Sequence, residues 1–146
     1  MGVLADFFVA SEADALRYAA RIEKLDGGEE IEALLKPVQY KSFTDLEIST
    51  LWAILEEQEW DDERHMPEDI FLGDDGESWL YRFPNELTEV LAHANEVAVS
   101  KASVLWSATE ELSCEPEDLV PVLNDLQSLA KQAMESGKSL YLWGCL

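Results

Sequence analysis

The sequence predicts an α+β fold in which four or five helices pack on a small, mostly antiparallel β-sheet. Two observations predict it. Residues 3–9 and 139–146 are apolar almost without interruption, which is typical of strands that are buried on both faces and central in a sheet. Segments with helical periodicity, the clearest being 44–57 and 116–136, lie between these two ends. The N- and C-terminal strands are therefore expected to be neighbours within a single globular domain, residues 1–146.

The N-terminal third is predicted to hold a strand, a helix, a helical turn and a weak second strand. Residues 3–9, VLADFFV, form the first strand, and Ser11 follows as the N-cap of the helix. The apolar face of that helix comprises Ala15, Leu16, Ala19, Ile22 and Leu25. The glycines of DGG, 26–28, end the helix, and EIEALL, 30–35, is a short helical turn. VQYKSF, 38–43, alternates weakly and fits an edge strand or an extended linker.

The middle of the chain begins with the clearest helix signal. TDLE, 44–47, is a capping box, in which the Thr44 hydroxyl accepts from the backbone of Glu47 and the Glu47 side chain reaches back. The helix runs to about Glu57, and its apolar stripe comprises Ile48, Leu51, Trp52, Ile54 and Leu55. IFLGDDGESWLYRF, 70–83, predicts two short strands around the GDDG turn.

The C-terminal third is predicted to hold three helices before the last strand. PNELTEVLAHA, 84–94, is a helix whose inward residues are Leu87, Val90, Leu91 and Ala94. Residues 97–112 could begin as a strand, but a helix is favoured by the face comprising Val97, Lys101, Val104, Leu105, Ala108 and Leu112. Pro116 begins the longest helix, Pro121 can make it restart or kink, and Gly137 ends it.

The two ends of the chain also carry a family resemblance. MGVLADFF at the start, and a long helix followed by SGKSLYLW at the end, resemble an uncharacterised family of small bacterial cytoplasmic proteins. They are distantly similar in layout to the YfbM-like family, which opens with Met-Gly and an aromatic strand and closes with helix, glycine and strand. The resemblance implies a bacterial source and a mixed α/β fold, and it implies no catalytic residues.

The negative charge is concentrated in the middle of the sequence. Residues 44–97 hold sixteen acids and two bases, a net charge of −14, against −21 for the whole chain. No basic stripe is present to replace the counterions of phosphate groups, so direct binding of nucleic acid is disfavoured. An anionic membrane surface is disfavoured for the same reason.

The sequence favours a cytoplasmic location. No stretch approaches the length of apolar residues that a membrane-spanning helix needs, and the N-terminus lacks the basic and apolar regions of a signal peptide. Cys114 and Cys145 are expected to be reduced thiols, because a chain of this size does not need a disulfide.

The acidic segment EEQEWDDERHMPED, residues 56–69, raises the question of a metal site. His65 lies among Asp61, Asp62 and further carboxylates, and hard cations bind oxygen ligands. The segment contains neither glycine nor the ordered ligand spacing of a calcium loop. A solvated acidic loop is therefore favoured over a dedicated metal site.

Glu89 and His93 are the other candidate metal ligands. They lie four residues apart on a predicted helix and so share one face, although a surface Glu–His pair explains this spacing equally well. The sequence holds no phosphate loop, no dinucleotide fingerprint and no zinc-ligand spacing, so no cofactor is expected.

Trp60 and Trp79 are the most informative residues for function. Both lie in polar surroundings, where a tryptophan either covers the edge of the core, the more common case, or anchors a protein partner. We therefore expect a non-enzymatic, acidic protein-binding module for a basic partner, such as an immunity or inhibitor protein against a cationic toxin. The residues expected to bind are Trp60, Asp61, Asp62, Glu63 and Trp79.

Two other functions remain open. A metal-assisted hydrolase would use His65, or Glu89 with His93, together with nearby carboxylates, and it requires these groups to converge in one pocket. A small module without any ligand is the third possibility.

Overall fold

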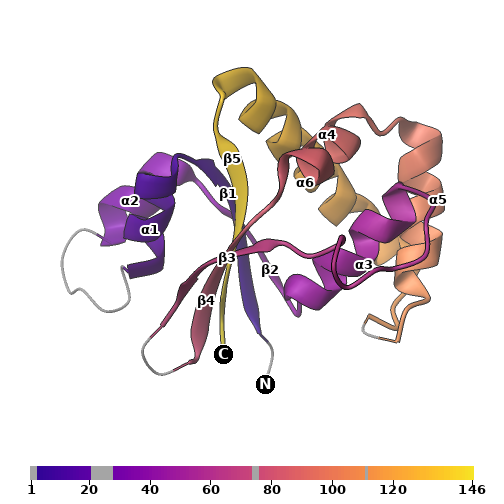
Figure 1. The fold of residues 1–146 in the computed structure, drawn as a ribbon, viewed down its shortest axis with the longest axis horizontal. Coiled ribbons are helices and arrows are strands. Elements are labelled where there is room, and N and C mark those ends of the chain that lie inside the picture. The colour runs from indigo at the N-terminus through magenta and orange to yellow at the C-terminus, as the bar shows by residue number, and fades with distance from the viewer. Residues whose placement is uncertain (1–2, 21–27, 74–75, 111) are drawn as a thin grey trace.

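The structure is a computed structural model that describes residues 3–20, 28–73, 76–110 and 112–146. Its strands are β1 (Leu4–Ala10), β2 (Val38–Lys41), β3 (Glu68–Leu72), β4 (Ser78–Arg82) and β5 (Ser139–Cys145). They form one antiparallel sheet in the order β2-β1-β5-β4-β3 (Figure 1). The weakly alternating segment at 38–43 is thus an edge strand, and of the two short strands predicted within 70–83, β3 forms the opposite edge and β4 lies between β3 and β5.

The predicted adjacency of the terminal strands is confirmed. β1 and β5 pair along their whole length, from Leu4 opposite Cys145 to Ala10 opposite Ser139. Each strand has a second neighbour on its other side, so neither is an edge. Strands that are apolar on both faces must be covered on both faces, and the central positions of the sheet provide that cover.

Helices cover both faces of the sheet. The helices are α1 (Glu12–Ala20), α2 (Gly28–Leu35), α3 (Asp45–Leu55), α4 (Asn85–His93), α5 (Glu96–Ser107) and α6 (Pro116–Ser136). α1 and α2 lie on one face, and α3 to α6 form the layer on the other (Figure 1). The described residues form six helices rather than four or five, because the turn predicted at 30–35 is a helix of two turns.

Some predicted details of α1 and the β3–β4 turn differ or are not described. Leu16 was expected to face inward and is instead exposed, whereas Ala15 and Ala19 are buried as expected. The expected end of this helix at 26–28, with Ile22 and Leu25, lies outside the described residues. Asp74 and Asp75 of the predicted GDDG turn also lie outside them.

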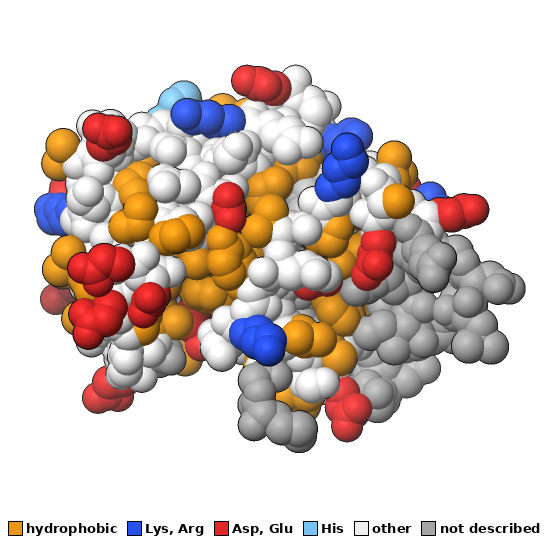
Figure 2. Space-filling view, turned by 180° about the vertical axis from the view of Figure 1, so that it is seen from behind, with side chains coloured by type: hydrophobic (Ala, Val, Ile, Leu, Met, Phe, Trp, Pro, Cys, Tyr) orange, Lys and Arg blue, Asp and Glu red, His pale blue; other side chains and the backbone are white. Residues whose placement is uncertain are grey.

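Acidic side chains are not confined to one face of the molecule. Seen from behind, they stand among basic, polar and apolar side chains (Figure 2). Exposed acids also occur on helices far apart in the fold, such as Glu12 on α1, Glu86 on α4 and Glu135 on α6. The uneven charge along the sequence therefore does not become a single acidic face.

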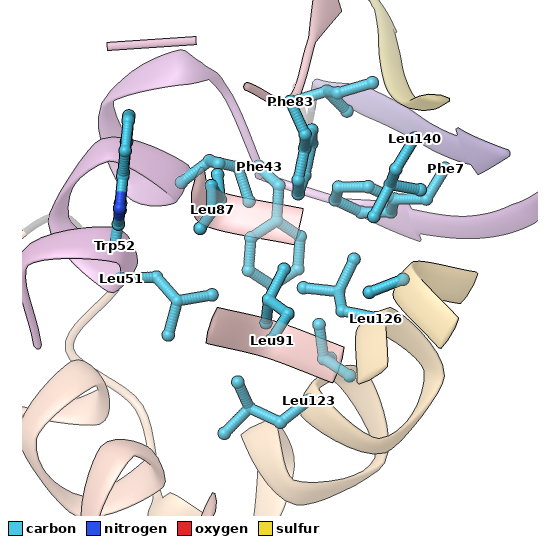
Figure 3. Packing of buried hydrophobic residues seen from close by; sticks show 14 of the residues in the cluster. Phe7, Phe43, Leu51, Trp52, Phe83, Leu87, Leu91, Leu123, Leu126 and Leu140 are labelled. Carbon is cyan, nitrogen blue, oxygen red and sulfur yellow. The ribbon is translucent and has the colours of Figure 1, made fainter. Parts of the chain in front are cut away.

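Two hydrophobic cores flank the sheet because alternate residues of a strand point to opposite faces. Phe7 belongs to the larger core under α3, α4 and α6, where it lies near Phe43, Phe83 and Leu140 (Figure 3). Phe8 faces the other way and packs against aromatic rings of α1 and β5 in the smaller core.

The long helix α6 runs without interruption through Pro121, so it does not restart there. Pro121 lacks the N–H that would bond to the carbonyl of Glu117, close to the start of the helix, where a lost bond costs least. Six apolar side chains of α6 are buried and hold the helix on the sheet. Gly137, with a φ of 69°, ends the helix as predicted.

The predicted inward face of α5 is wrong. Val97, Val104 and Leu105 are 75%, 55% and 47% exposed. The buried face instead comprises Val99, Ala102, Ser103, Trp106 and Ser107. The fully buried indole of Trp106, whose Nε1 donates to the carbonyl of Glu47 at 3.0 Å, decides which side of the helix turns inward.

Candidate functional site

The acidic segment, residues 56–69, leaves α3 in a defined conformation. Gln58 N–H donates to the carbonyl of Ala53 at 3.0 Å, which closes the last turn of α3. Glu57 stands at the left-handed position of this turn with a φ of 56°, where glycine is usual. Its carboxylate pairs with Lys101 Nζ of α5 at 2.6 Å. The start of the acidic segment is therefore held next to α5.

His65 closes the segment on itself. Its ring is fully buried, Asp61 N–H donates to Nδ1 at 3.0 Å, and Nε2 lies 2.8 Å from Glu56 Oε1. Because Nδ1 accepts, the proton is on Nε2 and points at the Glu56 carboxylate. His65 N–H also donates to the carbonyl of Asp61 at 2.8 Å. The acids of the segment other than Glu56 are exposed as expected, but the burial of its histidine was not predicted from the sequence.

The Glu56 carboxylate is hydrogen-bonded to two side chains of the segment, Arg64 and His65. Arg64 binds it in a fork, with Nε to Oε1 at 3.1 Å and Nη2 to Oε2 at 2.6 Å. The hydrogen bond from Arg64, and after it the one from His65, lower the pKa of Glu56 below its ordinary value. Trp52 lies beneath, 5.8 Å from the Arg64 guanidinium and 5.4 Å from the His65 ring. This arrangement is a scaffold that positions the rest of the segment.

The exposed part of the segment presents an indole among carboxylates. Trp60 is 48% exposed, and its Nε1 donates to the hydroxyl of Ser49, a fully buried residue of α3. The same hydroxyl contacts the Met66 sulfur at 3.6 Å, so the Trp60 and Met66 side chains meet over Ser49. The exposed acids that flank Trp60 along the chain are Glu59, Asp61, Asp62 and Glu63.

Trp79 lies in the β-sheet rather than in the acidic segment that carries Trp60. It lies on β4 opposite Gly144, with its indole directly above that glycine. A Cβ atom on Gly144 would come within 2.0 Å of Trp79 Nε1. Trp79 Nε1 is buried and has no hydrogen-bond partner among the described residues. The structure therefore places Trp79 in the packing of the sheet, while Trp60 lies with Asp61, Asp62 and Glu63.

The candidate metal ligands do not converge. Both ring nitrogens of His65 are already engaged within its own segment, so neither has a free lone pair for a metal ion. Glu89 and His93 are exposed on α4. Within the described ranges, no group of three or more His, Cys, Asp or Glu side chains is arranged to hold a metal ion.

Cys114 and Cys145 do not form a disulfide with each other, and both are partly buried. Burial, followed by the nearby carboxylates of Asp118 and Glu115, raises the pKa of the Cys114 thiol. A raised pKa keeps this thiol protonated at neutral pH, which makes it a poor nucleophile.

The contacts that hold Trp60 in place were not predicted from the sequence. Ser49 and Met66 carry no sequence signal for this role, because their meeting depends on how the segment folds back over α3. The exposed face of α5 did carry a signal. Two helical faces compete in that segment, and Trp106 marks the one that is buried, since the largest aromatic residue gains most from burial.

No family model, no curated protein and no solved structure matches this chain. The resemblance of the two ends to the YfbM-like family therefore stays a prediction. In the part of the chain that the structure describes, no helix combines the length and apolar character needed to cross a bilayer.

Proposed function

We propose that this protein is a non-enzymatic binding module that recognises a basic surface of another protein through Trp60 and the carboxylates around it. The observation that carries the proposal is the half-exposed Trp60 indole, which is hydrogen-bonded to a buried residue and flanked along the chain by exposed acids. The position of the Trp60 side chain is already fixed in the unbound protein, because hydrogen bonds hold both the indole and the loop that carries it.

An anchored aromatic side chain suits a protein interface. Binding hot spots are enriched in tryptophan, and a side chain that is already fixed loses less entropy on binding than a mobile one. The exposed acids provide attraction at a distance, which raises the rate of encounter with a basic partner. Arg64 and Lys101, the basic residues in contact with this region, are paired with Glu56 and Glu57 and so do not cancel the charge of the other acids.

The concrete form of the proposal is an immunity or inhibitor protein for a cationic toxin or enzyme. Such a partner must be met quickly and covered by opposite charge, and electrostatic attraction serves both needs. A metal-assisted hydrolase that uses His65, or Glu89 with His93, receives less support, because both ring nitrogens of His65 are occupied and Glu89 and His93 are exposed on α4.

The test is retention of cationic proteins from a bacterial extract on the immobilised protein at low and at high salt. We expect retention at low salt that is reduced at high salt, since screening weakens interactions between exposed charges. Trp60→Ala should weaken binding of a retained partner by about 30-fold, the effect of losing roughly 2 kcal/mol at a hot spot.

The matched control is Leu34→Ala, which shortens a similarly exposed apolar side chain on α2. Retention that ignores salt, or that Trp60→Ala and Leu34→Ala reduce equally, contradicts the proposed function.

A further inference from the structure

Helix α5 exposes an apolar stripe directly opposite its buried face. Successive residues of an α-helix are turned by about 100°, so positions 97, 101, 104 and 108 project from one side. The exposed stripe consists of Val97, Lys101, Val104, Leu105 and Ala108. The buried side of α5 packs on α3 and α6. Helix α5 lies at the outer edge of the helical layer (Figure 1). The described structure thus leaves this side of α5 uncovered.

The stripe is also free of acids. The chain has 31 Asp and Glu residues, yet residues 97–109 contain none, and no longer run without them occurs in the sequence. An exposed helix of so acidic a protein would be expected to carry its share of carboxylates. Depletion of charge on an exposed apolar face is characteristic of the core of a protein interface.

The spacing of the stripe suits another helix. Val97, Lys101, Val104 and Ala108 follow intervals of four, three and four residues, which is the spacing of a helix–helix seam. Lys101, the charged member of the seam, is paired with Glu57 at 2.6 Å.

Exposed acids lie at the two ends of the stripe. Glu96 stands at the start of α5 and Glu110 follows its end, whereas Glu57, beside the middle, is paired with Lys101. Apolar residues between acidic ends complement a helix that has an apolar face and basic flanks.

A second copy of this chain fits the stripe less well. Each copy carries a net charge of −21, so two copies repel each other.

We infer that the exposed face of α5 is the docking site for a basic amphipathic helix of the protein partner. This inference rests on the proposed function and deepens it, because it defines the kind of element that binds. Glu57 and Trp60 are three residues apart, so their Cα atoms lie within about 11 Å of each other. A helix seated on α5 can therefore also reach the Trp60 indole.

The test uses a fluorescent synthetic peptide made of leucine and lysine, with leucines at the four–three spacing and lysines elsewhere. A scrambled peptide of the same composition has the same charge and lacks an apolar face. We expect the patterned peptide to bind the full chain at least about 10-fold more tightly than the scrambled one by fluorescence anisotropy at low salt. The double variant Val97→Ser/Val104→Ser should lose this preference.

The matched control is Leu34→Ser/Met134→Ser, which removes two exposed apolar side chains elsewhere and should retain the preference. Circular dichroism melts verify that each variant is folded, which is expected because all four side chains are exposed. Equal binding of both peptides, or equal effects of the two double variants, overturns the inference. A wild-type dimer in sedimentation that the α5 variant abolishes also overturns it, because a second copy would then cover the stripe.

Trp60→Ala separates the inference from the proposed function. If Trp60→Ala weakens binding of both peptides and the α5 variant has no effect, the proposed function stands and the α5 site is overturned. If the α5 variant removes the preference and Trp60→Ala changes nothing, the α5 site stands and the role of Trp60 is wrong.

Discussion

Trp60 and Trp79 have similar neighbours in the sequence and opposite roles in the fold. Trp60 has acidic and polar neighbours on both sides, in EQEWDDE, and Trp79 follows Glu77 and Ser78, in GESWLYR. Trp60 is half-exposed over α3, whereas the Trp79 indole lies flat on Gly144 in the sheet. The difference teaches that local composition does not determine the burial of a tryptophan. The burial of Trp79 depends on the small residue opposite it, and only strand pairing brings Gly144 there.

The largest effect is expected from adding a side chain under Trp79. Gly144→Ala should destabilise the protein by about 3 kcal/mol, because the new Cβ atom overlaps the indole and neither the strand nor the ring can easily move. Urea denaturation measures the change. In a Trp79→Ala background the same substitution should cost far less, and an equal cost would show that the indole does not rest on Gly144.

Removing the two indoles provides a direct comparison. Trp79→Ala should lower the free energy of unfolding by about 2 kcal/mol, because its ring is partly buried in the sheet. Trp60→Ala should lower it by less than about 1 kcal/mol, because its ring is half in water. Thermal denaturation of both variants checks the order, and a reversed order would contradict the different roles assigned to them.

His65 holds the loop that carries Trp60 through its hydrogen bonds to Asp61 and Glu56. His65→Ala should cost about 2 kcal/mol, since it leaves Asp61 N–H and the Glu56 carboxylate without their partner. It should also increase hydrogen exchange in residues 57–65, measured by mass spectrometry, because the loop loses its closure. His93→Ala is the control, because His93 is exposed on α4 and its removal should be nearly neutral. Unchanged exchange in His65→Ala would show that this ring does not hold the loop.

The smallest effect is a pH dependence at Glu56. Its pKa is lower in the folded protein than its ordinary value of 4.5, chiefly because Arg64 stabilises the carboxylate. The folded state is therefore stabilised above about pH 4.5, and this contribution is lost as the pH falls toward the lowered pKa. Solvent screening keeps it below about 1 kcal/mol.

Glu56→Gln isolates this contribution. Protonation of the many other acids affects the wild type and the variant alike, so the difference between their melting temperatures reports Glu56. The difference should shrink as the pH falls from 6 to about 3. A difference that is constant over this range would mean that Arg64 and His65 do not stabilise the charged form.

The sequence by itself determined which segments became strands and helices. The capping box of Thr44 and Glu47 marks the start of α3, and Gly137 marks the end of α6, because caps and left-handed turns depend on residues close in the chain. The two terminal apolar strands were predicted to be central neighbours, since residues without a polar face must be covered on both sides.

The tertiary structure decided the features on which function depends. Residues 97–112 offered two helical faces, and the packing of Trp106 against α3 selected one of them and left Val97, Val104 and Leu105 exposed. The burial of His65, and the meeting of Trp60 with Ser49, likewise depend on a loop that folds back over α3. Periodicity and caps are properties of neighbouring residues, whereas these contacts join residues from different elements, and their energies exist only once the elements have packed.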